Sequence, residues 1–161
     1  MARQYSVPEQ IPFVEVLPIA TDAAGRTGSY ISLKNALKAW LVCEVNQGNA
    51  AQVTFTPLQA QDVAGTGSKA IAATRIHVNQ DRAASDIGAW QAAAAALQLS
   101  ATLKSKIAIF EIVPEQVLDV TNGFRTLTVQ TSASNAANIT KAMLVYLPAY
   151  MQAAPPSTLI N

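Results

Sequence analysis

The stretch Lys38–Pro57, which reads KAWLVCEVNQGNAAQVTFTP, decides the fold class of this chain. Two apolar runs, residues 39–45 and 52–56, flank a polar segment that contains Gly48. Both runs are rich in β-branched and aromatic side chains, which are typical of strands, and asparagine and glycine tolerate the backbone conformations of a tight turn. The stretch therefore predicts two strands joined as a central β-hairpin. The continuous apolar run before the turn predicts that its strand is buried on both faces.

Similar patterns of short strands and turn signals continue along the chain. Further strands are predicted at residues 70–79, 106–113 and 124–131. Asn122-Gly123 is a strong turn signal and predicts a second hairpin into the last of these strands. Residues 81–100 fit a short helix and a strand equally well, because an alanine run has high helix propensity but these alanines also alternate with leucines.

About seven short strands and almost no amphipathic helix predict an all-β fold. A length of 161 residues suits one domain, residues 1–161, built as an antiparallel β-sandwich of jelly-roll or immunoglobulin-like type. Residues 1–29 contain three prolines and are expected to form an extended arm or an edge strand. Residues 151–161, which contain a Pro-Pro pair, are expected to form an extended tail.

A short internal repeat links two distant segments. Residues 135–140 (NAANIT) echo residues 49–54 (NAAQVT), so that both copies pass an Asn-Ala-Ala corner and then enter a strand. The repeat suggests two similar hairpins that form corners of the sandwich.

The low charge of the chain favours assembly with other proteins. Charged residues make up 13% of the sequence, against about 25% in ordinary soluble domains. Charged residues are depleted at the centres of interfaces, so a chain that buries surface against copies or neighbours needs fewer of them. The formal net charge of +1 comes without any run of like charge, which argues against a nucleic-acid partner. We also expect no membrane partner, no transmembrane span and no secretory signal peptide.

The sequence offers no catalytic, cofactor or metal motif. Cys43 is expected to be a buried apolar side chain, and His77 lacks the companions that a metal site or a nucleophile would need. Residues 65–69 (GTGSK) do not have the glycine and lysine spacing of a phosphate-binding loop. Glu44 and Glu111 are expected to lie apart or to meet lysines rather than to form a glycosidase pair.

Five stretches together resemble small structural proteins of tailed bacteriophages and prophages, in particular those encoded near the major capsid protein; they are residues 30–36 (YISLKNA), 45–51 (VNQGNAA), 56–60 (TPLQA), 62–69 (DVAGTGSK) and 134–140 (SNAANIT). This resemblance implies a non-catalytic virion protein that is made in the cytoplasm of a host bacterium. It implies a capsid decoration or minor capsid protein that binds the phage major capsid protein on the outer shell and self-associates as a homo-oligomer.

Such proteins often make contacts through extended termini. The resemblance therefore makes apolar residues near the two ends the candidates for protein contact, namely Tyr5, Ile11, Phe13, Leu159 and Ile160. Two alternatives remain, a tail or connector structural protein and a carbohydrate-binding β-sandwich at the virion surface. The second alternative would use exposed aromatic side chains, for which the candidates are Tyr30, Trp40, Trp90, Tyr146 and Tyr150.

Overall fold

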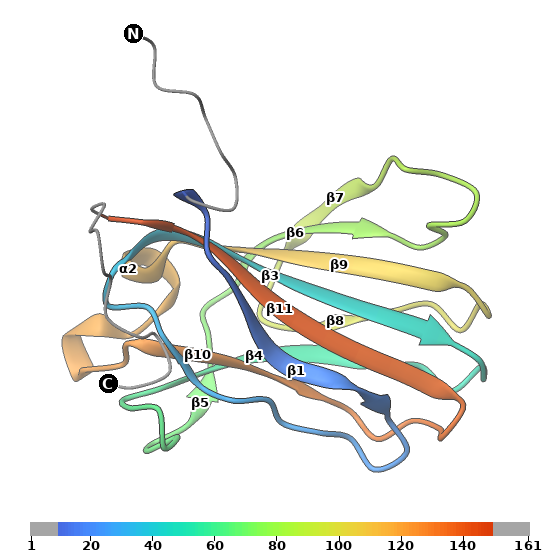
Figure 1. The fold of residues 1–161 in the computed structure, drawn as a ribbon, viewed down its shortest axis with the longest axis horizontal. Helices are drawn as coiled ribbons and strands as arrows, with labels where there is room; N and C mark the ends of the chain where they lie inside the picture. Colours follow the sequence, from blue (N-terminus) through green and yellow to red (C-terminus); the bar gives the residue numbers. More distant parts are fainter. Residues whose placement is uncertain (1–9, 150–161) are drawn as a thin grey trace, which may run out of the picture.

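Two antiparallel sheets packed face to face make up the part of the chain that the structure, a computed structural model, describes, residues 10–149 (Figure 1). The six-stranded sheet has the order β1 (Phe13–Thr21), β11 (Asn138–Pro148), β3 (Ala36–Gln47), β9 (Ser105–Ile112), β6 (Thr74–Asn79) and β7 (Ala89–Ala94). The five-stranded sheet has the order β2 (Ile31–Ser32), β10 (Thr126–Thr131), β4 (Thr54–Ala60) and β5 (Lys69–Ala70), and β8 (Leu97–Gln98) also pairs with β4. The predicted all-β sandwich is confirmed.

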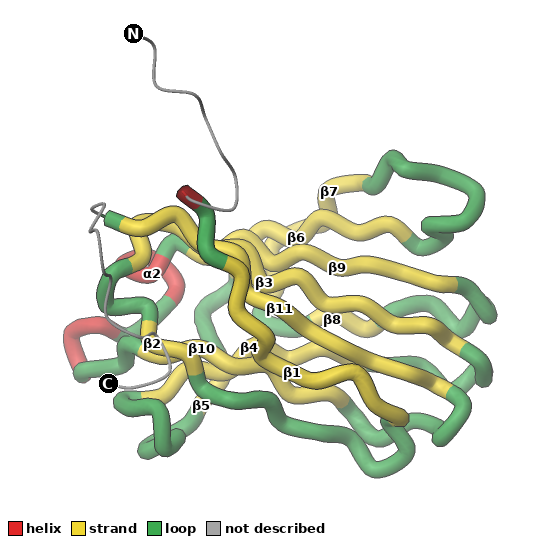
Figure 2. The backbone as a smooth tube through the Cα atoms, viewed as in Figure 1, coloured by secondary structure: helices red, strands yellow, loops and turns green. Residues whose placement is uncertain are grey.

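Within residues 10–149, helical structure is confined to two short turns after β9, α2 (Pro114–Val117) and η1 (Val120–Asn122), apart from a single helical residue that precedes β1 (Figure 2). Pro114 begins α2 because the fixed φ of proline suits the first turn of a helix and its missing N–H needs no partner there. Among residues 10–149, no helix has the length and apolar character to span a membrane.

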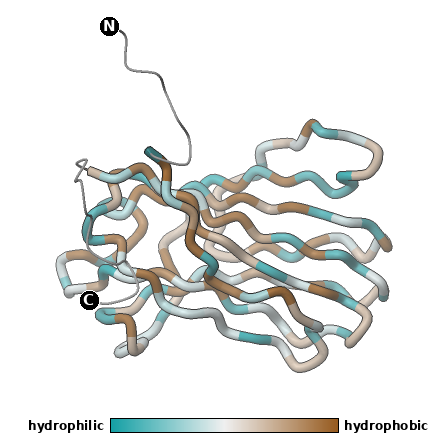
Figure 3. The backbone as a smooth tube through the Cα atoms, viewed as in Figure 1, coloured by the Kyte–Doolittle hydropathy of each residue, from teal (hydrophilic) through white to brown (hydrophobic). Residues whose placement is uncertain are grey.

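The core lies between the two sheets and is built by alternation along the strands. Hydrophobic residues recur along the strands of both sheets (Figure 3). Every second side chain of β3 and β9 is buried against the side chains of β4 and β10, and these inward residues include Leu41, Cys43, Phe55, Phe110, Leu127 and Val129. The burial expected for Cys43 is confirmed.

The predicted central hairpin is wrong. β3 lies between β11 and β9 in the six-stranded sheet, whereas β4 pairs with β10, β5 and β8 in the other sheet. Residues 48–53 therefore cross from one sheet to the other, and Val53 is fully buried at the end of the crossing. The turn signal was correct as a change of direction, but the chain crosses between the sheets there, and each strand makes its hydrogen bonds to strands from other parts of the chain.

The second predicted hairpin is also wrong. Residues 117–120 run from the last residue of α2 to the first residue of η1 and form no strand. Gly123 follows with a φ of 83°, and its N–H donates to the carbonyl oxygen of Val120 at 3.1 Å. The Asn-Gly pair thus ends a 3₁₀ turn, because this left-handed conformation serves a helix terminus as well as a hairpin.

The short repeat marks two equivalent corners that touch each other. In each corner, the first asparagine accepts a hydrogen bond from the backbone N–H two residues later, at 2.9 Å for Asn49 and 2.9 Å for Asn135. Asn138 joins the corners: its Oδ1 accepts from the N–H of Asn49 at 2.9 Å, and its Nδ2 donates to the carbonyl of Ala51 at 2.8 Å. The corners connect sheets and are not hairpins.

The ambiguous stretch 81–100 contains strands and no helix. β7 pairs antiparallel with β6, and β8 pairs with β4. Gly88 lets the chain enter β7, because a Cβ at this position would lie 2.4 Å from a ring carbon of His77. Sheet pairing therefore overrides the helix propensity of the alanine run.

Two leucines on β3 allow a matched test of the sandwich. Leu41 is fully buried between the sheets, whereas the side chain of Leu37 is 60% exposed. We expect Leu41→Ala to lower the free energy of unfolding by about 2–5 kcal/mol, because it leaves a cavity in the core. Leu37→Ala should cost less than about 1 kcal/mol. Urea denaturation of both variants checks this, and equal losses would contradict the burial of Leu41 between the sheets.

Candidate functional site

The outward side of the six-stranded sheet carries a continuous set of apolar side chains. We call this set the outer face, and it consists of Trp40 and Val42 from β3, Ile107 and Ile109 from β9, and Met143 and Val145 from β11, all partly exposed. Strand register places Met143 beside Val42, and Val42 beside Ile109, in one row across the sheet. Side chains directly opposite each other on neighbouring strands are in contact range. The outer face is therefore a surface rather than a scatter of single residues.

The other sheet has a different outward side. β4 turns the partly exposed Thr54 and Thr56 outward, and β10 turns the exposed Gln130 outward. Thr126 and Thr128, on the same side of β10, are fully buried. A sheet with one face in solvent normally alternates apolar and polar residues in this way. The six-stranded sheet departs from that rule, and its outer face is the candidate functional site.

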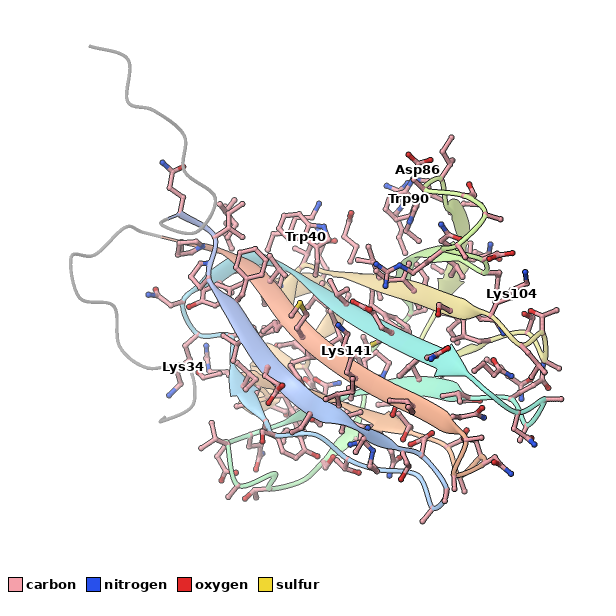
Figure 4. All side chains as sticks on the ribbon, turned by 45° about the vertical axis from the view of Figure 1, so that its right-hand side comes forward. Lys34, Trp40, Asp86, Trp90, Lys104 and Lys141 are labelled. Atoms are coloured by element: carbon pink, nitrogen blue, oxygen red, sulfur yellow. The ribbon has the colours of Figure 1, made fainter. Side chains whose placement is uncertain are left out.

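Apolar residues at the rim extend the outer face. Phe13 is 54% exposed and pairs with Val145, so that its side chain lies on the same side of the sheet. At the opposite edge, Trp90 is 51% exposed and pairs with His77. Figure 4 shows Trp40 on the sheet and Trp90 at the projecting end formed by β7.

Among the described residues, one of the contact candidates predicted from the sequence lies next to the outer face. Phe13 joins the rim of the outer face, while Ile11 is partly buried just before β1. Tyr5, Leu159 and Ile160 lie outside the described residues. The sequence does not identify the outer face, because the continuous apolar run of β3 predicts a strand that is buried on both faces.

A signal for the outer face was present in the sequence. The apolar runs in residues 39–45 and 106–113 leave almost no polar position for solvent, yet the sequence predicts almost no amphipathic helix that could cover a second sheet face. In an all-β sandwich, such strands must expose apolar side chains on the outside.

Ion pairs surround the outer face and account for the two acids considered above. Glu44 accepts from Arg82 at 2.6 Å and lies 3.4 Å from the Nζ of Lys141, and Glu111 lies 3.2 Å from the Nζ of Lys38. Glu44 is level with Ile107 in the strand register, four residues from Glu111 along β9, which corresponds to about 13 Å. That separation exceeds the roughly 5–9.5 Å of a glycosidase pair, so the expectation that these acids lie apart and meet cations is confirmed.

The aromatic side chains do not line a common groove. The guanidinium of Arg75 lies 4.2 Å from the centre of the Trp90 ring, and His77 meets that ring edge-on at 5.2 Å. Tyr146 is buried, and the Tyr30 hydroxyl bonds to Ser68 at 2.5 Å. Trp40 lies three strands from Trp90 in the sheet order. Tyr150 lies outside the described residues.

The buried ionisable groups have structural partners. Lys106 is fully buried, and its Nζ donates to Gln47 Oε1 at 2.6 Å and to the carbonyl of Ser100 at 2.5 Å, which ties the loop before β9 to β3. Burial lowers the pKa of Lys106 and raises the pKa of the Cys43 thiol. Within residues 10–149, no group of three His, Cys, Asp or Glu side chains could hold a metal ion.

Asp22 offers a test of these buried groups. Burial raises the pKa of this carboxyl above 3.8, and it does so despite a hydrogen bond from Thr131 Oγ1 at 2.5 Å and the presence of Arg26. A group with a raised pKa in the folded chain contributes stability that is fully present below pH 3.8 and is lost as the pH rises through the raised pKa. The free energy of unfolding of the wild type, relative to Asp22→Asn, should therefore fall as the pH rises from below 3.8 to neutral.

Asp62 provides the control with the opposite sign. The backbone N–H of Thr66 at 3.0 Å and its hydroxyl at 2.7 Å hold the pKa of this exposed carboxylate below 3.8. Its contribution is present above pH 3.8 and is lost as the pH falls through the lowered pKa. Urea denaturation across a pH series measures both. If Asp22→Asn and Asp62→Asn changed the pH dependence in the same direction, the assignment for Asp22 would be wrong.

Comparisons with known proteins add one structural similarity. No family model matches this chain, and neither does any curated protein. Among solved structures, the fold is similar to that of the SPBc2 prophage-derived protein YomS, with 10% sequence identity and a TM-score of 0.47. The similarity covers 84% of this chain and 91% of that protein.

Proposed function

We propose that this chain is a non-catalytic structural protein of a phage particle and that it binds another virion protein through its outer face. In its specific form, the proposal is a capsid decoration protein that binds the phage major capsid protein on the assembled head. The observation that carries it is the adjacency of six apolar side chains on the outward side of one sheet. The resemblance of five sequence stretches to phage head proteins supports the choice of partner.

The composition of the outer face fits a protein partner. Exposed apolar patches rimmed by polar or charged groups mark surfaces that bind other proteins. Here the rim consists of paired charges such as Glu44 with Arg82, and Glu111 with Lys38. Paired charges present little net field to attract a charged ligand, so the apolar side chains supply the affinity and the rim supplies orientation.

A repeating shell is a partner on which a contact of modest strength has an effect, because each occupied site adds its own contribution. Fully burying a large apolar side chain gains about 1.5–3 kcal/mol, so six side chains that are already half buried gain roughly 6 kcal/mol in all. Association costs about 4–15 kcal/mol, so one copy gains little by binding one partner. A shell offers many identical sites, and a protein that binds only the assembled state stabilises that state at each occupied site.

A carbohydrate-binding function has less support. A sugar ring stacks on an open aromatic face, but Arg75 already covers the most exposed tryptophan, Trp90. Among residues 10–149, the other exposed aromatic side chains do not converge on a groove.

Met143 lies in the central row of the outer face and provides the test. We expect Met143→Asp to reduce co-sedimentation with heads assembled without this chain by at least tenfold, because it buries an unpaired charge in the contact. Thr56→Asp, on the outward side of β4, is the matched control and should bind as the wild type does. Circular dichroism and urea denaturation establish that both variants fold.

Two results would overturn the proposal. If Met143→Asp co-sediments as well as the wild type, the outer face is not the contact. Alternatively, the wild type could bind isolated tails but not heads, which would move the protein to the tail or connector class.

A further inference from the structure

The end of the sandwich away from the two Asn-Ala-Ala corners carries a pocket. We call it the end pocket, and it opens between the start of β3 and the helical turns α2 and η1, with a volume of about 310 Å³. Strand register places it, because Ala36 pairs with Pro148 at this end of β3, whereas Gln47 pairs with Asn138 beside the corners. Among the described residues that line the end pocket, none belongs to the outer face.

The floor of the end pocket is apolar and its mouth is polar. Leu33 and Leu118 are 3% and 6% exposed, Pro114 is buried, and Val120 is half-buried. Four exposed residues surround the mouth, namely Lys34, Glu115, Thr121 and Arg125. A group that enters the pocket therefore meets apolar atoms at the bottom and charged groups at the opening.

Two cations at the mouth have no partner within this chain. Among residues 10–149, every other lysine and arginine side chain makes an ion pair, a hydrogen bond or a contact with an aromatic ring. The side chains of Lys34 and Arg125 make none of these contacts with the described residues, and neither forms an ion pair with Glu115. Both cations are therefore available to an anion that enters the mouth.

Hydrogen bonds fix the backbone of the two cations relative to each other. The N–H of Arg125 donates to the carbonyl of Ala60 at 3.1 Å, and the carbonyl of Arg125 accepts from the N–H of Leu33 at 2.8 Å. Lys34 directly follows Leu33 in the chain. Since both cations start from a rigid backbone beside a buried floor, a ligand pays less of the cost of ordering its site.

We propose that the end pocket binds the carboxyl-terminal residue of a partner protein chain, when that residue has an apolar side chain. Lys34 and Arg125 contribute two positive charges and Glu115 one negative charge, so the mouth has a net charge of +1, which a single carboxylate neutralises. A carboxylate can also accept two parallel hydrogen bonds from a guanidinium. A doubly charged phosphate group would fit this charge less well.

The size and openness of the end pocket favour a chain end over a free small molecule. Its volume is near the lower limit of the roughly 300–1,000 Å³ of small-molecule sites, which bury about 70–90% of their ligand. The exposed mouth would leave much of a free ligand in solvent. A chain end places a carboxylate and an apolar side chain on one residue and needs to bury that residue alone, and capture of a terminal carboxylate is a known mode of peptide recognition.

Short peptides that differ only in their last residue or last group test the proposal. The probes are acetyl-Gly-Ser-Gly-Leu with a free carboxyl end, the same peptide with an amidated end, and acetyl-Gly-Ser-Gly-Ser with a free carboxyl end. The first should bind about tenfold more tightly than either of the others, because the second lacks the charge and the third lacks the apolar side chain. NMR titration of the isotope-labelled chain measures this, with amide shifts centred on Ala36, Leu118 and Val120.

Substitutions at the mouth separate a site from a general charge effect. Arg125→Gln and Lys34→Gln should each weaken binding of the first peptide by about threefold and leave binding of the amidated peptide unchanged. Lys104→Gln, which removes a charge at the opposite end of the sandwich (Figure 4), is the matched control and should bind as the wild type does.

Three results would contradict the proposal. The first is equal binding of the free and amidated peptides, which would mean that the cations do not hold the carboxylate. The second is a titration without shifts at the pocket amides, which would mean that the pocket is closed or filled by another segment of this chain. The third is an equal loss of binding in Lys104→Gln and Arg125→Gln, which would indicate attraction by net charge without a site.

Discussion

The side chain of Asn138 holds the two chain crossings together, and the arrangement of the sheets depends on this contact. It is fully buried, and it bonds to both the N–H of Asn49 and the carbonyl of Ala51. One corner joins β3 to β4, and the other joins β10 to β11. β3 and β11 are neighbours in one sheet, and β4 and β10 are neighbours in the other. Gln47 and the buried Lys106 close the same end of the sandwich. An unpaired polar group here would cost about 1–3 kcal/mol, so the network specifies the crossings as well as stabilising them.

This arrangement determines where apolar surface remains. The inner sides of both sheets fill the core, and the outward sides of β4 and β10 carry polar side chains, including Thr56 and Gln130. In contrast, β3, β9 and β11 of the six-stranded sheet also carry apolar side chains on their outward side, the six residues of the outer face. Since no helix among residues 10–149 covers the second side, the outer face is available to another protein. In this fold, apolar side chains of a chain that is poor in charge gather on one exposed surface, the outer face. Such a surface suits contact with another protein.

Much of the secondary structure could be predicted from the sequence, but the pairing of strands could not. β9 and β10 were predicted within one or two residues because their apolar and β-branched residues alternate. The turn signals at Gly48 and Gly123 indicate only that the chain changes direction, whereas packing between distant segments decides which strand becomes the neighbour. The outer face was missed for a related reason: an apolar run indicates that a strand is buried, but it does not say whether the cover comes from this chain or from another.

The most direct measurement is an electron cryomicroscopy map of an assembled phage particle in which this chain can be placed. The account predicts that the chain lies on the outside of the head, with Trp40, Met143 and the rest of the outer face against a neighbouring protein. The threonine-bearing side of the other sheet should face solvent. A map in which the outer face is exposed to solvent, or in which the head does not contain the chain, would contradict the account.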